Sequence, residues 1–218
     1  TQLRRKQRKH ALARSERRRQ RVRGGARTVG LAGYTNAGKS SLFLALSGKQ
    51  VLVEDKLFST LETTVGRMEM SPRILLADTI GFIDELPSDL LDAFHATLDE
   101  SLQCDLLLLV VDSSDEPEEF KRKLSTTRRE VLERGDESGM NIKVVLTKSD
   151  LGGNIESAIE TVNSMGMTNP LVVSSHDGQG MDELRESIMY SLYGPKTTLV
   201  VSQGCLLYTS DAADELSC

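Results

Sequence analysis

The residues with the clearest chemical meaning form a glycine-rich loop that ends in a lysine and a serine. The loop follows the pattern G-x-x-x-x-G-K-[S/T], in which backbone N–H groups surround a phosphate chain, the lysine reaches the terminal phosphates and the hydroxyl binds Mg²⁺. We expect nucleotide contacts from Gly33, Tyr34, Thr35, Asn36, Ala37, Gly38, Lys39, Ser40 and Ser41. A chance match in a glycine-containing loop is the alternative. The strand-like run 28–32 before the loop and the helical composition of residues 41–46 after it favour a nucleoside triphosphate site.

A second box can act on the γ-phosphate. Residues 73–78 form an apolar run of strand length that ends in an acid. The D-x-x-G box that this run delivers consists of Asp78, Thr79, Ile80 and Gly81. A carboxylate at a strand end can hold the Mg²⁺ shell, and the glycine N–H can sense a γ-phosphate. Alone, this box is a weak signal.

Two later boxes indicate which base is bound. The first follows the strand-like run 142–146 and consists of Thr147, Lys148, Ser149 and Asp150. It resembles the guanine-reading N-K-x-D box of GTPases, with Thr in place of Asn. The Asp150 carboxylate can accept both N–H groups on one edge of guanine, whereas adenine would leave it unmatched at a cost of roughly 1–3 kcal/mol or more. The second box is placed like the S-A-K box that supports the base, and consists of Ser174, Ser175 and His176. These boxes favour GTP over ATP.

An irregular stretch, residues 50–66, is long enough to be a functional loop. A threonine there can close on Mg²⁺ and the γ-phosphate, so that the loop orders in the triphosphate state. We prefer Thr60 as this ligand and keep Thr64 as the alternative. The neighbouring residues expected at the nucleotide are Phe58, Ser59, Leu61 and Glu62. The expected metal ligands are Ser40, Thr60 and, through water, Asp78; the expected catalytic groups are Lys39, Gly81 and Thr60.

These boxes need an α/β domain with a mostly parallel sheet flanked by helices. Strands are predicted over residues 28–32, 65–70, 73–78, 105–112, 142–146 and 171–173, with a hairpin around residues 71–72. Helices are predicted after the glycine-rich loop and over residues 88–102, 116–134, 155–165 and 181–192. The apolar run 105–112 reads as the central buried strand.

Charge divides the 218-residue chain into two parts. Residues 1–27 carry 12 Lys and Arg against one acid, a net charge of +11, whereas the remainder carries a net charge of −16. A basic arm on an acidic body indicates nucleic-acid binding by the arm, and a solvated helical linker is the alternative. The three cysteines show no metal or disulfide spacing, which fits a reducing cytoplasm, and no apolar run is long enough to span a membrane.

Four segments are expected along the chain. A basic helical linker over residues 1–27 precedes a GTPase domain over residues 28–193, which we expect to be monomeric. Residues 194–203 would begin a further segment. Residues 204–218 look like the translation of a transposase adapter used in sequencing-library preparation, so we expect both natural ends to be missing.

With these motifs assembled, the chain resembles the HflX family of ribosome-associated GTPases. The resemblance extends from about Gln2 to Val201, and the Tyr-Thr-Asn-Ala wording inside the phosphate loop is more discriminating than the general pattern. The matching segments are residues 33–43, 57–62, 77–83, 86–87, 93–94 and 97–100.

The resemblance implies hydrolysis of GTP to GDP and phosphate with Mg²⁺, coupled to binding of the large ribosomal subunit through ribosomal RNA. It also implies that residues 1–27 are the family's basic linker and that Thr60 is the loop ligand of Mg²⁺. Two departures are Thr147 in place of Asn, which leaves the nucleotide affinity open, and Ser175-His176 in place of Ala-Lys.

Two rival functions remain open: a related RNA-modification or ribosome-assembly GTPase, and a nucleotide-dependent binding module with negligible turnover of its own. Phe82 follows Gly81, where many GTPases place a Gln that orients the attacking water. We therefore expect slow hydrolysis without an activator.

Overall fold

The computed structural model describes residues 27–48, 64–68, 74–78, 102, 104–134 and 141–195. The strands are β1 (Arg27–Ala32), β2 (Thr64–Met68), β3 (Ile74–Asp78), β4 (Leu106–Asp112), β5 (Ile142–Thr147) and β6 (Leu171–Val172). The helices are α2 (Lys39–Ser47), α4 (Pro117–Arg134), the 3₁₀ turn η1 (Ser149–Leu151), α5 (Ile155–Ser164) and α6 (Met181–Tyr193).

The strands form one sheet in the order β2-β3-β1-β4-β5-β6. Only β2 is antiparallel: it pairs with β3 as the predicted hairpin, while the other neighbours pair in parallel. Because parallel strands end at the same edge, the segments that follow β1, β4, β5 and β6 gather there, where ligands bind in such folds. The predicted fold class is confirmed.

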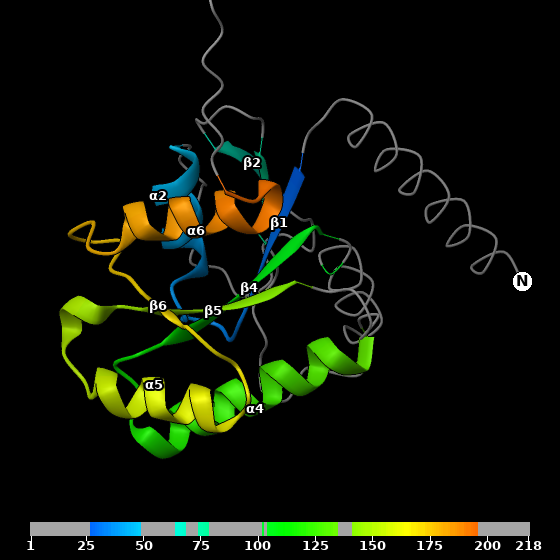
Figure 1. Ribbon diagram of the computed structural model, residues 1–218. Helices are drawn as coiled ribbons and strands as arrows, with labels where there is room; N and C mark the ends of the chain where they lie inside the picture. The colour runs from blue at the N-terminus through cyan, green and yellow to red at the C-terminus, as the bar shows by residue number, and fades with distance from the viewer. Residues whose placement is uncertain are drawn as a thin grey trace, which may run out of the picture.

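Helices cover both faces of this sheet, with α2 and α6 on one face and α4 and α5 on the other (Figure 1). The alternation of side chains along β4 explains the two layers. Leu106, Leu108 and Val110 join the core beneath α2 and α6, whereas Leu107 and Leu109 join the core beneath α4 and α5. Every residue of β4 is buried, as its nearly continuous apolar sequence predicts for a central parallel strand.

The helix ends follow from local sequence. α2 ends at Gly48, whose left-handed backbone lets its N–H bond the Leu44 carbonyl. α4 starts with Pro117, which lacks the N–H that a first helical turn leaves unused. The Asn154 side chain caps α5 by accepting from the Ser157 N–H at 3.0 Å. The bounds of the described elements agree with the predicted ones to within two residues.

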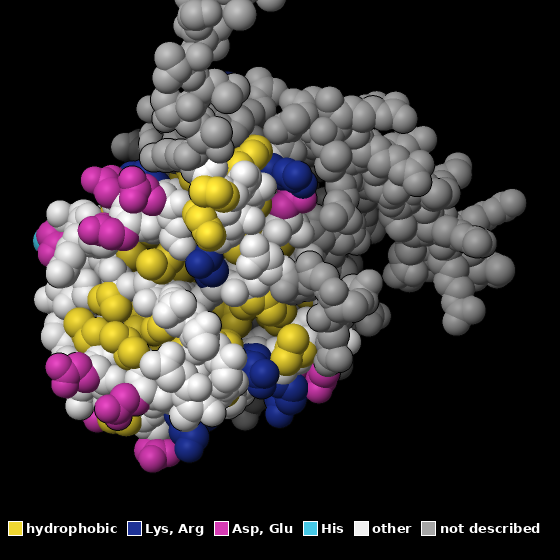
Figure 2. All heavy atoms as spheres, in the orientation of Figure 1, with side chains coloured by type: hydrophobic (Ala, Val, Ile, Leu, Met, Phe, Trp, Pro, Cys, Tyr) yellow, Lys and Arg dark blue, Asp and Glu magenta, His cyan; other side chains and the backbone are white. Residues whose placement is uncertain are grey.

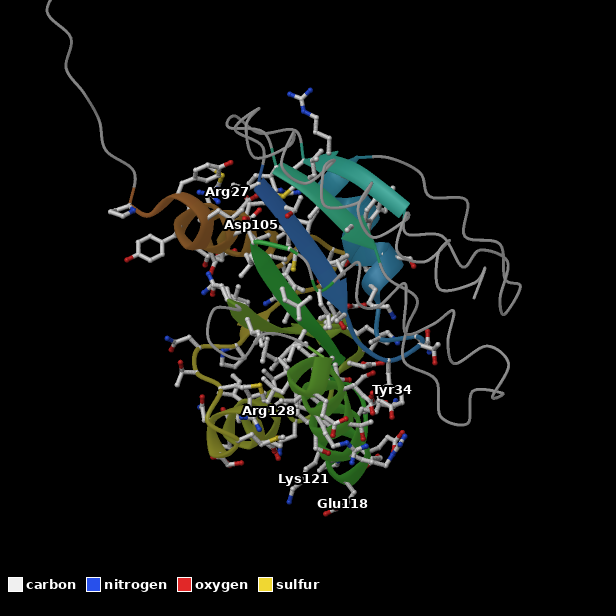
Figure 3. All side chains as sticks on the ribbon, turned by 90° about the vertical axis from the view of Figure 1, so that its right-hand side faces the viewer. Arg27, Tyr34, Asp105, Glu118, Lys121 and Arg128 are labelled. Carbon is white, nitrogen blue, oxygen red and sulfur yellow. The ribbon has the colours of Figure 1, made fainter. Side chains whose placement is uncertain are left out.

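The edge opposite the site holds the start of β1. The Asp105 carboxylate accepts from the Thr28 backbone N–H at 2.8 Å and from the Arg27 guanidinium at 3.2 Å (Figure 3). Arg27 therefore belongs to the sheet, although it was counted with the predicted arm of residues 1–27. The rest of that arm, the predicted helix 88–102 apart from Leu102, and residues 196–218 lie outside the described residues. In the described ranges, no helix combines the length and apolarity needed to cross a membrane.

Candidate nucleotide-binding site

The glycine-rich loop, residues 33–40 and called the P-loop below, leaves β1 at the carboxyl edge of the sheet. Gly33 is required by close packing, since a Cβ there would lie 2.2 Å from the carbonyl oxygen of Val110. Asn36 and Gly38 both have left-handed backbones, with φ of 61° and 82°. Asn and Gly are the residues that adopt this conformation most readily. The sequence of the loop therefore favours the backbone turn that it adopts.

The amino end of α2 points its first backbone N–H groups out of this loop. Its capping position is Gly38, which provides no side-chain hydrogen bond, and its first turn holds no acid. The Lys39 ammonium lies at the same place, 6% exposed, and donates to the carbonyl of Tyr34 at 2.7 Å. Backbone N–H groups at a helix amino end together with a lysine form an anion site, which suits a phosphate chain.

Tyr34 attaches the P-loop to α4 on the other face of the sheet (Figure 3). Its ring is buried, and the guanidinium of Arg122 lies 5.4 Å from the ring centroid. Glu119 holds that guanidinium with two hydrogen bonds of 2.7 Å. A cation over an aromatic face contributes about 0.5–1 kcal/mol at an exposed site. Tyr34 is thus both a residue of the loop and its anchor in the core.

The predicted base-reading groups meet at the ends of β5 and β6. Asp150 is exposed, and its Oδ1 accepts from the hydroxyl of Ser174 at 2.7 Å. Ser174 is fully buried, and its oxygen accepts from the backbone N–H groups of His176 and Asp177 at 3.2 and 3.3 Å. A carboxylate anchored on one side and open on the other can accept the paired N–H groups of a guanine edge.

Lys148 is held by a carboxylate from the neighbouring strand. Its backbone is left-handed, with φ of 60°, and its Nζ lies 2.6 Å from Oδ2 of Asp112, at the end of β4. Burial acts to raise the pKa of Asp112, but hydrogen bonds from Lys148 and Ser114 and the charge of Lys148 outweigh it. The pKa of Asp112 therefore lies below its usual value of 3.8.

Asp112→Asn is expected to lower the free energy of unfolding at neutral pH by about 1–3 kcal/mol, because it leaves the Lys148 ammonium without its carboxylate partner. The folded pKa is depressed, so the Asp112 contribution is complete above pH 3.8 and is lost as the pH falls through the folded pKa. The difference in free energy of unfolding between the wild type and the variant should therefore become smaller in acid. Urea unfolding at pH 7 and below pH 4 measures it, with Glu160→Gln on α5 as an exposed control that should change little. Equal stabilities at pH 7 would contradict the ion-pair assignment.

The remaining predicted site residues divide into two groups. Thr35, Asn36 and Ser41 are exposed on the P-loop side, Ser40 and Ser175 are half-buried, and His176 is exposed in a turn. The backbone of Asp78 pairs with Leu31 at the end of β3, next to the P-loop strand. The predicted site residues outside the described ranges are Phe58, Ser59, Thr60, Leu61, Glu62, Thr79, Ile80 and Gly81.

Three residues around the site were not predicted: Asp112, Arg122 and Ser113. Asp112 is an acid that ends an otherwise apolar strand, a signal that could have indicated a role at the carboxyl edge. Ser113 follows it, and its N–H and hydroxyl donate to the carbonyl of Thr147 at 3.0 and 2.7 Å. The sequence around Arg122 carries no comparable signal, because α4 is rich in charge along its length.

Comparison with known proteins agrees with this geometry. The sequence profile of the 50S ribosome-binding GTPase family matches residues 28–148, more than half of the chain. The GTPase HflX of Gluconacetobacter diazotrophicus is 43% identical over 163 residues, which cover 74% of this chain and 35% of that protein. The GTPase HflX of Escherichia coli is 36% identical over 183 residues, covering 83% and 42% respectively. The chain thus spans less than half the length of these curated relatives.

A solved structure extends the similarity to three dimensions. A GTP-binding protein from Sulfolobus solfataricus, in complex with GDP, superposes with a TM-score of 0.65 at 29% identity and covers 76% of this chain and 52% of its own. The mostly parallel sheet flanked by helices fits these relatives. The chain belongs to the 50S ribosome-binding GTPase family, and the resemblance of its motifs to the HflX proteins is confirmed.

Proposed function

We propose that the chain binds GTP and hydrolyses it to GDP and phosphate. The observation that carries this proposal is the meeting of two recognition groups at one edge of the sheet. The P-loop, with Lys39 and the amino end of α2, suits a phosphate chain. Asp150, anchored by Ser174, suits the N–H edge of guanine. The GDP complex of the Sulfolobus solfataricus protein supports a guanine nucleotide as the ligand.

At the phosphate end, water attacks the γ-phosphate in line with the leaving oxygen. Lys39 and the N–H groups of the first turn of α2 stabilise the charge that spreads over the phosphate oxygens. Thr60 and the N–H of Gly81 are proposed to complete this set on the opposite side. The bond from Lys39 to the Tyr34 carbonyl holds the ammonium at the loop.

The donor set at this edge fits Mg²⁺, which prefers hydroxyl and carboxylate oxygens. We propose Ser40 and Thr60 as direct ligands and Asp78 as a ligand through water. Thr64 is the alternative to Thr60, and its backbone pairs with Asp78 across β2 and β3. When bound, Mg²⁺ neutralises charge on the β- and γ-phosphates.

We further propose that the GTPase cycle controls binding to the large ribosomal subunit in the cytoplasm. The name of the matched family supports this partner. The charge distribution supports the basic arm as the RNA contact: Asp and Glu side chains stand out over α5 and α6 (Figure 2), where phosphates would be repelled. The exposed acids on these helices are Glu156, Glu160, Asp182, Glu183 and Glu186.

A phosphate-release assay with Mg²⁺ and GTP tests the proposed activity, with and without large ribosomal subunits. Lys39→Ala should reduce kcat/KM by about 10²–10³, the usual loss when one group that stabilises transition-state charge is removed. Lys121→Ala, on an exposed position of α4, is the matched control and should behave like the wild type. Tight GTP binding without phosphate release in either condition would instead establish a nucleotide-dependent binding module.

A further inference from the structure

Thr147 belongs by sequence to the base-reading box, yet its side chain contacts the phosphate-binding loop. The residue is 1% exposed. Its hydroxyl lies 2.7 Å from the carbonyl oxygen of Ala37 in the P-loop and 3.1 Å from the carbonyl oxygen of Val111 in β4. The side chain also lies against Gly38, where a Cβ would come within 3.3 Å of the hydroxyl oxygen.

We propose that the Thr147 hydroxyl is a positioning group for the phosphate end of the nucleotide: it holds the P-loop in its binding shape and leaves base recognition to Asp150. This inference rests on the proposed function. Ala37 lies between the two left-handed residues of the loop, Asn36 and Gly38. A hydrogen bond at Ala37 therefore restrains the segment that sets the direction of the first α2 N–H groups and of Lys39.

The number of hydrogen-bond donors on the side chain distinguishes positioning of the P-loop from recognition of the base. A threonine hydroxyl has a single proton, and here the acceptors within reach are backbone carbonyls of the P-loop and β4. An asparagine amide, usual in this box, has two N–H donors and could serve both the loop and a base. Thr147 has no second donor for a base, because its one proton is directed at these carbonyls, of which that of Ala37 is nearer, and its side chain is buried.

The backbone of Thr147 is fixed from the other side. Its carbonyl accepts from the Ser113 N–H at 3.0 Å and from the Ser113 hydroxyl at 2.7 Å. Gly153 packs against the same turn, since a Cβ there would lie 2.6 Å from the Ser113 carbonyl oxygen. Because the backbone of Thr147 is held in place, its hydroxyl cannot follow the Ala37 carbonyl if that carbonyl moves. The hydrogen bond therefore keeps the Ala37 carbonyl in position.

The test compares GDP with GMP, because GMP lacks the β-phosphate that the P-loop surrounds. Thr147→Val keeps the size of the side chain and removes the hydroxyl, whereas Thr147→Ser keeps the hydroxyl. Thr147→Val should weaken GDP binding about tenfold, the equivalent of one buried hydrogen bond. GMP binding should change less than twofold, and Thr147→Ser should bind GDP within about twofold of the wild type. Competition against a fluorescent GDP analogue measures these affinities.

Thermal unfolding without nucleotide checks that each variant is folded. If Thr147→Val is not, Thr147→Cys, with a weaker donor of similar size, takes its place. An equal loss of GDP and GMP affinity, or unchanged GDP affinity, would overturn the inference. Failure of the wild-type chain to bind any guanine nucleotide would overturn the proposed function instead.

Discussion

Asp150→Asn is expected to lower the affinity for GTP by about 100-fold and to make xanthosine triphosphate the preferred ligand. In the proposed site the carboxylate accepts from both N–H groups of the guanine edge. An amide in its place presents an NH₂ to the guanine amino group, so two donors face each other. Xanthine has a carbonyl at that position, which accepts from the amide.

The geometry around Asp150 favours a change of nucleotide preference from GTP to xanthosine triphosphate. The Ser174 hydroxyl donates to Oδ1 at 2.7 Å, and the amide oxygen of Asn can accept the same bond. The new NH₂ is then directed away from Ser174, toward the open side of the site. Competition binding with both triphosphates measures the change.

Ser174→Ala is the matched control for this exchange. It removes the anchor and keeps the carboxylate, so GTP affinity should fall about tenfold with guanine still preferred. Unchanged GTP preference in Asp150→Asn would show that the carboxylate does not read the base.

The second large expected effect is an increase of about 10³–10⁵ in single-turnover GTP hydrolysis when large ribosomal subunits are added. Phe82 follows the D-x-x-G box, and a phenyl ring cannot orient a water molecule by hydrogen bonding. Arg122, which the structure places beside the P-loop, is engaged by Glu119 and the Tyr34 ring. Groups that position water or neutralise charge are therefore expected from the ribosome.

Quench-flow assays at several salt concentrations measure this effect. A chain that starts at residue 27, and so keeps the Arg27–Asp105 pair of β1, should lose much of the stimulation and of its salt dependence. Its GTP affinity should remain near that of the full chain. Fast turnover by the isolated chain, unchanged by ribosomal subunits, would show that the chain contains a catalytic group not identified here.

Much of the architecture could be predicted from local patterns. The apolar run that became β4, the motifs that follow β1, β3, β5 and β6, and the antiparallel pairing of β2 with β3 each depend on neighbouring residues. The alternation of side chains along a strand and the caps at helix ends depend on residues only a few positions apart. Their effects can therefore be predicted before the fold is known. The same holds for the P-loop at Asn36 and Gly38, because these residue types adopt a left-handed backbone more readily than others.

The interactions that fix the site in place could not be predicted in this way, because they join residues far apart in the chain. Thr147 meets Ala37 across 110 positions, and Arg122 meets Tyr34 across 88. The Lys148–Asp112 pair depends on the parallel register that places Thr147 beside Asp112. By itself, the sequence determined which groups could bind a guanine nucleotide. The tertiary structure decided which of these groups contact one another, because strand order and register set the distances between them.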